Sequence, residues 1–217
     1  MIGILKKNAG YYLVYGIFFL AMSVVMWHSA FDRLRTPIAV INSFFMFFVV
    51  VVPALSAEAI EEKHRGYPFL MTLPLKLETV VRAKMALPIM AVAMAVAFNL
   101  VLFRFFQSTP SVLDDCVKII LLNASVAIIL AGAVFLLMYR YNVRMLMMVL
   151  VFVGVGFNFL GLIAARTSGI GNIFEWSELI VTGKPVWVFI LLIPVSLAIY
   201  HLAFRRALRL KEERLFD

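Results

Sequence analysis

Six apolar segments constrain this chain more than any other feature, because none contains Asp, Glu, Lys or Arg and each is about 20 residues long. A helix of that length crosses the roughly 30 Å of hydrocarbon in a bilayer. The segments are residues 11–30, 38–57, 85–103, 119–139, 145–165 and 186–204. With 64% hydrophobic residues, the chain has more apolar side chains than a single aqueous core can bury. The sequence predicts an all-α integral membrane protein with six transmembrane helices, in which residues 1–217 form one domain.

The distribution of Lys and Arg predicts the orientation of these helices. If the N-terminus lies in the cytosol, 14 of the 20 cationic residues fall in cytosolic segments. The other six lie two to each external loop, and they are Arg33, Arg35, Arg104, Lys118, Arg166 and Lys184. Because cytoplasmic loops carry the excess of Lys and Arg, we expect both termini to be cytoplasmic. We attribute the net charge of +8 to this topology and to contact with membrane lipid, and expect no nucleic-acid partner.

The two ends of the chain have the composition of helices at a membrane surface. Residues 1–7 combine apolar side chains with Lys6 and Lys7, which predicts a short interfacial helix before the first span. Residues 205–216 carry five cations and predict a helix that prolongs the last span into the cytosol, near anionic lipid.

The segment from Glu58 to Lys84, called the charged loop below, separates the second and third apolar segments. Nine charged residues surround an apolar cluster at residues 67–71. Gly66 is a natural helix end and Pro68 a natural first-turn residue, so the pattern predicts a helix, a short crossing helix up to Pro74, and a third helix from residue 75. Exposing large apolar side chains costs about 1.5–3 kcal/mol each unless something covers them. Either a partner protein or the inner lipid headgroups would cover this cluster.

The charged loop resembles the permease subunits of type-2 ATP-binding-cassette (ABC-2) transporters. The resemblance rests on a glutamate-rich helix end, a glycine, a Thr-Leu-Pro triplet and a Val-x-x-Lys entry into the next span. The matching residues are Glu58, Glu61, Glu62, Gly66, Thr72, Leu73, Pro74, Val80, Val81 and Lys84. The likeness is strongest to small bacterial permeases, including exporters of peptide toxins and antimicrobial peptides. The span count, the N-terminal helix and the position of the loop extend it to the whole chain.

This resemblance implies how such a chain would work in the bacterial cell membrane. Two permease copies, identical or related, would form a twelve-span pore, and each charged loop would be a coupling helix seated in a cleft of one of two ABC ATPase subunits. The chain has no Gly-x-x-x-x-Gly-Lys-Ser/Thr motif, so ATP and Mg would be bound by the ATPase. The residues assigned to ATPase coupling are Glu58, Glu61, Glu62, Arg65, Gly66, Tyr67, Phe69, Leu70, Leu73 and Pro74. The expected activity is ATP-driven export of amphipathic or hydrophobic substrates, and peptides are the favoured substrate class.

Polar residues inside the apolar segments suggest a translocation path. In the resembled family, spans two and five line the interface between the permeases. The candidates for the path are therefore Asn42, Phe45, Phe48 and Asn158. The alternative is that the asparagines only form hydrogen bonds between helices and that the phenylalanines only pack. No acidic residue lies in the middle of a span, which disfavours proton-coupled transport.

Two other classes of membrane protein fit the sequence less well. Glutamic intramembrane proteases have paired glutamates followed by three residues and an arginine, whereas here Glu61 and Glu62 are separated from Arg65 by only two. No zinc-ligand spacing and no Gly-x-Ser-x-Gly motif occurs, so we expect no catalytic residues and no metal site. A membrane anchor or immunity-type protein without a motor would not need the apolar cluster in the charged loop.

Overall fold

The computed structural model describes residues 9–18, 21, 51–59, 76–106, 110–141, 146 and 183–216. Within these residues all regular secondary structure is α-helical. The three long helices are α4 (Leu77–Phe106), α5 (Pro110–Arg140) and α8 (Val186–Phe216). Two shorter helical segments are Ala9–Phe18 and residues 51–59. The all-α prediction is therefore confirmed for the described part of the chain.

Three of the predicted spans lie in the described residues, and all three are long apolar helices. The stretches able to cross a bilayer by length and composition are Glu78–Leu102, Asp114–Arg140 and Val186–Leu210. They contain the predicted spans at 85–103, 119–139 and 186–204, apart from residue 103, which is still within α4. The other predicted spans fall wholly or partly outside the described residues. A count of six spans therefore stays a prediction.

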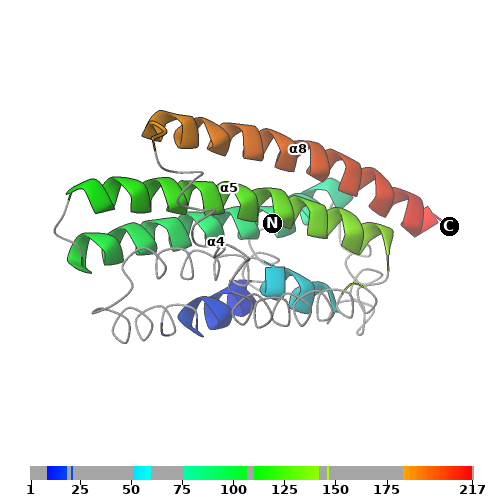
Figure 1. Cartoon of the computed structure of the whole chain (residues 1–217). Helices are drawn as coiled ribbons and strands as arrows, with labels where there is room; N and C mark the ends of the chain where they lie inside the picture. The colour runs from blue at the N-terminus through cyan, green and yellow to red at the C-terminus, as the bar shows by residue number, and fades with distance from the viewer. Residues whose placement is uncertain are drawn as a thin grey trace, which may run out of the picture.

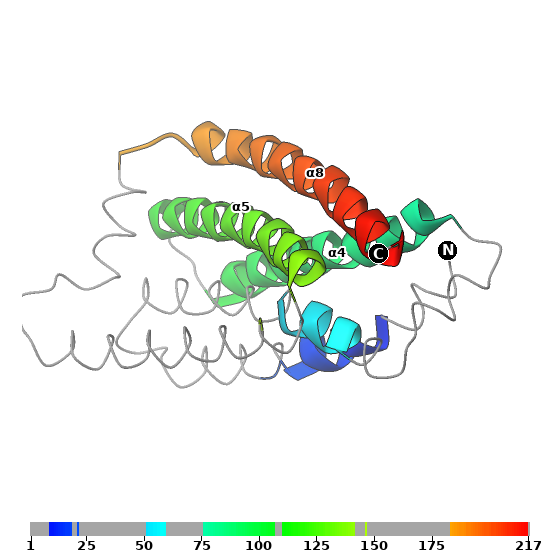
Figure 2. The same cartoon turned by 90° about the vertical axis from the view of Figure 1, so that its right-hand side faces the viewer.

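The long helices run side by side, with α4 and α5 between α8 and the two shorter helical segments (Figures 1 and 2). Only three residues separate Phe106 from Pro110, so α4 and α5 are antiparallel. Helix α8 runs in the same direction as α5 (Figure 1). The start of α4, the end of α5 and the end of α8 consequently lie at one end of the bundle, called the loop end below.

Small residues allow α5 and α8 to approach closely. A Cβ atom added to Gly132 of α5 would lie 3.2 Å from both Ala203 Cβ and Tyr200 Cδ2 of α8. Ala131 and Ala207 are also buried in the same core. Close approach at small residues is how helices gain van der Waals contact where lipid provides no hydrophobic drive for association. The extensive α5–α8 contact therefore follows from the positions of glycine and alanine.

Large apolar side chains also cover the outside of the bundle, as a membrane requires. Leu13 and Phe18 are more than half exposed, as are Met94 in α4 and Trp187 and Leu202 in α8. In water such a surface would drive aggregation, whereas in a bilayer it is solvated by lipid tails.

The structure describes two of the predicted helix ends. The helix predicted from residue 75 begins at Leu77, where the amide of Thr79 donates to the Lys76 carbonyl over 2.9 Å. In its first turns Glu78 pairs with Arg82 at the surface. The helical extension of the last span is confirmed, because α8 continues to Phe216, while its cytosolic position stays a prediction. The helix predicted for residues 1–7 lies outside the described residues.

Candidate functional site

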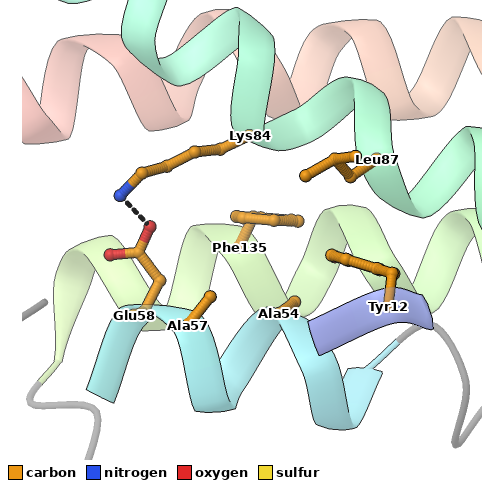
Figure 3. Close-up of a pocket in the computed structure, with 7 residues that line it drawn as sticks. All are labelled: Tyr12, Ala54, Ala57, Glu58, Lys84, Leu87 and Phe135. Atoms are coloured by element: carbon orange, nitrogen blue, oxygen red, sulfur yellow. Dashed lines mark hydrogen bonds and ion pairs between the residues drawn. The ribbon is translucent and has the colours of Figure 1, made fainter. Parts of the chain in front are cut away.

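A buried ion pair joins the first and last residues of the charged loop. Lys84 Nζ lies 2.7 Å from Glu58 Oε1, and the side chains are only 4% and 6% exposed. Glu58 extends from the helix at residues 51–59 and Lys84 from α4, so the pair bridges two helices at the loop end (Figure 3).

The burial of both charges follows from their place in the helical repeat. In the first helix, Val51, Ala54, Leu55 and Glu58 occupy positions i, i+3, i+4 and i+7, and all four are buried. In α4, Val81, Lys84 and Met85 share one face in the same way. Residues at these spacings form a single stripe along a helix. Each charge therefore stands where the pattern calls for an apolar core residue.

Two buried charges are costly unless they satisfy each other. Moving each ion out of water costs several kcal/mol, and attraction repays this cost only when the geometry is good and further hydrogen bonds are present. The 2.7 Å contact is a charge-assisted hydrogen bond of ordinary length. The Tyr139 hydroxyl of α5 also approaches Glu58 Oε1 at 3.5 Å, which is long for such a bond. Charged side chains buried in membrane proteins are uncommon, which makes this pair a candidate functional site.

Four helical elements meet around a small cavity beside the pair. Its volume is about 10 Å³, room for about one water molecule. The lining residues are Tyr12, Ala54, Ala57, Glu58, Lys84, Leu87 and Phe135. Figure 3 shows Tyr12 reaching toward Phe135 from the helix Ala9–Phe18. Its hydroxyl is buried and makes no hydrogen bond within the described part of the structure.

Helix α4 is weakened directly beyond Lys84. Pro88 lies inside the helix and has no N–H, so it cannot donate the bond that the Lys84 carbonyl accepts in a regular α-helix. One residue along, the Tyr200 hydroxyl of α8 donates to the Met85 carbonyl over 2.7 Å. A side-chain hydroxyl from a neighbouring helix is a common way to stabilise the backbone near a proline in a membrane helix. Tyr200 thus attaches α8 to α4 beside the ion pair.

The structure places one of the residues predicted to couple to an ATPase. Glu58 is described, and its carboxylate faces Lys84 inside the bundle. The others lie outside the described residues: Glu61, Glu62, Arg65, Gly66, Tyr67, Phe69, Leu70, Leu73 and Pro74. The path residues Asn42, Phe45, Phe48 and Asn158 also lie outside them. Asn99, one of the other span asparagines, is fully buried and its Nδ2 donates to Ala95 O, one turn earlier in α4.

Glu58 and Lys84 are motif residues of the charged loop, but the sequence motif does not predict that they pair. The signal was present, since each charge lies in phase with an apolar stripe. The supporting residues Tyr12, Phe135, Tyr139 and Tyr200 were not singled out, because an aromatic residue near the end of a span is equally typical of the membrane interface. No cluster of three His, Cys, Asp or Glu side chains able to hold a metal occurs among the described residues.

Comparison with known families gives a decisive match. Residues 3–205 match the family described as ABC-2 family transporter protein. The chain belongs to this family. An ABC-2 chain is a membrane component of an ABC transporter, and this membership implies an ABC ATPase as partner. Among curated proteins, no match to this ABC-2 chain is found.

Proposed function

We propose that this ABC-2 chain is the transmembrane subunit of an ATP-driven exporter that moves amphipathic or hydrophobic substrates, peptides first, out of a bacterial cell. The observation that carries the proposal is the family match over residues 3–205. Two copies of the chain, or one copy and a related permease, pair across the pore. Two ATPase subunits supply ATP and Mg binding, and the chain itself supplies the path through the membrane.

The charge distribution at the loop end supports a cytosolic position for this end. Exposed cations gather there from all three long helices, and they are Lys76, Arg82, Arg140, Arg205, Arg206 and Arg209. At the opposite end the described cations are fewer: Arg104 and Lys184 are exposed, and Lys118 is buried and pairs with Asp114 at 2.5 Å and Asp115 at 3.1 Å. Lys and Arg are retained on the cytoplasmic side of bacterial membrane proteins. The charged loop is then accessible to a cytosolic ATPase.

The charged loop is the proposed contact with the ATPase. Its apolar residues Tyr67, Phe69 and Leu70 enter a cleft of the ATPase, and movement of that subunit on ATP binding is passed to the two helices that flank the loop. Asn42, Phe45, Phe48 and Asn158 are proposed to line the path. The apolar character of the second predicted span suits an amphipathic cargo better than a hydrophilic solute.

Affinity purification from native membranes tests the partnership. The chain is expected to retain an ABC ATPase, and Phe69→Asp is expected to lose it because a carboxylate would be buried in an apolar cleft. Phe69→Leu keeps an apolar side chain and is the matched control. If the ATPase stays bound to Phe69→Asp, the coupling assignment is wrong. If the unmodified chain retains none, the proposal of an ATP-driven exporter fails and a motor-less anchor is favoured.

A further inference from the structure

Glu58 and Lys84 are the first and last residues of the charged loop, and Lys84 lies about two turns inside α4. If only the backbone joined the loop to the bundle, its two flanking helices could move separately when a partner displaces the loop. The buried pair links residues 51–59 directly to the first turns of α4 (Figure 3). A displacement of the loop then reaches both helices together.

The surroundings of the pair favour a mechanical role over a purely stabilising one. A stabilising core would be served as well by two apolar residues, which usually replace a buried ion pair without loss of stability. Beyond Lys84, α4 has the proline-weakened turn at Pro88, and Tyr200 holds that turn from α8. Helices bend at such turns. The first turns of α4 can therefore move with residues 51–59 while the remainder of α4 stays packed against α5 and α8.

From this arrangement we infer that Glu58 and Lys84 are positioning residues that hold the two ends of the charged loop together, so that the loop, residues 51–59 and the first turns of α4 move as one body. The inference rests on the proposed function, because it assigns the pair to the transmission of ATPase movement. Neither side chain needs to touch the ATPase or the cargo for this role.

Spin-label distances test the link between the loop ends without any ATPase. Labels at Ala59→Cys and Lys76→Cys, in a Cys116→Ala background, report in lipid nanodiscs the separation of residues 51–59 from the start of α4. Ala59 is partly buried and Lys76 exposed, and Cys116 is buried. The parent is expected to give a narrow distance distribution. Glu58→Gln/Lys84→Met, which removes both charges, is expected to broaden it, and Lys84→Arg, which keeps the cation, is expected to leave it narrow. An unchanged distribution in the double variant overturns the inference.

Transport coupling is tested in proteoliposomes that contain the chain and its co-purified ATPase. The probe is a dye-labelled amphipathic helical peptide of leucine and lysine, and the measured quantity is peptide moved per ATP hydrolysed. Glu58→Gln/Lys84→Met is expected to bind the ATPase and hydrolyse ATP but to lower this ratio about fivefold or more, the size of a typical coupling between sites. The reversed pair, Glu58→Lys/Lys84→Glu, is expected to move more peptide per ATP than the neutral double variant, at a ratio close to that of the parent.

Two results contradict the inference in this assay. An unchanged ratio in the neutral double variant shows that the loop ends need no link. A reversed pair as impaired as the neutral one shows that local packing, and not the ion pair, is what transport requires. Failure of the proposed function looks different, because the unmodified chain would then bind no ATPase, while the spin-label distances would still report whether the pair holds the loop ends.

Discussion

Removal of Lys84 alone tests whether the ion pair is as buried as the structure shows. Lys84→Met keeps an unbranched side chain but removes the ammonium group that lies 2.7 Å from the Glu58 carboxylate, which is 6% exposed. Breaking a buried pair in this way costs about 3–5 kcal/mol. For a chain of this size each kcal/mol lowers the melting temperature by about 2–4 °C, so a decrease of about 6–20 °C is expected.

The measurement is thermal unfolding of the purified chain in one detergent, followed by the fluorescence of its three tryptophans. Glu58→Gln/Lys84→Met removes both charges of the pair and is expected to melt much closer to the parent than Lys84→Met does, because replacing both members of a buried ion pair is often neutral. Lys84→Arg is the control for side-chain bulk and charge. If Lys84→Met melts within about 2 °C of the parent, the pair is not a buried one and the reasoning fails.

Three further substitutions have expected outcomes in the same assay. Gly132→Val is expected to lower stability by about 1–3 kcal/mol, because the new side chain would meet Ala203 and Tyr200. The control is Gly16→Ala, where an added Cβ has nothing within 4 Å, and it is expected to be neutral or slightly stabilising. Tyr200→Phe loses the hydroxyl that donates to Met85 O and is expected to cost about 1–2 kcal/mol, while unchanged stability would show that the turn at Pro88 needs no support. Arg82→Ala removes an exposed pair with Glu78 and is expected to change stability by less than about 1 kcal/mol; a loss as large as that of Lys84→Met would contradict the distinction between exposed and buried pairs.

The sequence predicted the parts of the fold that depend on length and hydropathy. Each described span matches an apolar segment, and α8 continues through the basic residues to Phe216, as predicted from the composition of residues 205–216. The family followed from the charged loop, whose motif residues include Glu58, Gly66 and Lys84, and the match over residues 3–205 confirms it.

The contacts between helices were not predictable in the same way. The pairing of Glu58 with Lys84 depends on how two helices are rotated toward each other, and a single sequence specifies this rotation only through weak preferences. The bond from Tyr200 to Met85 O joins residues 115 positions apart, and no local pattern signals it. Charges in phase with an apolar stripe are the feature that best indicates such a site, because only a partner on a neighbouring helix makes their burial tolerable.

The decisive measurement is ATP-dependent movement of the labelled amphipathic peptide in proteoliposomes that contain both the chain and its ATPase. We expect the peptide to cross the bilayer only when chain, ATPase and ATP are all supplied, and we expect Phe69→Asp to abolish the movement. Equal peptide movement without ATP, or a chain that never associates with a nucleotide hydrolase, would contradict the proposed function.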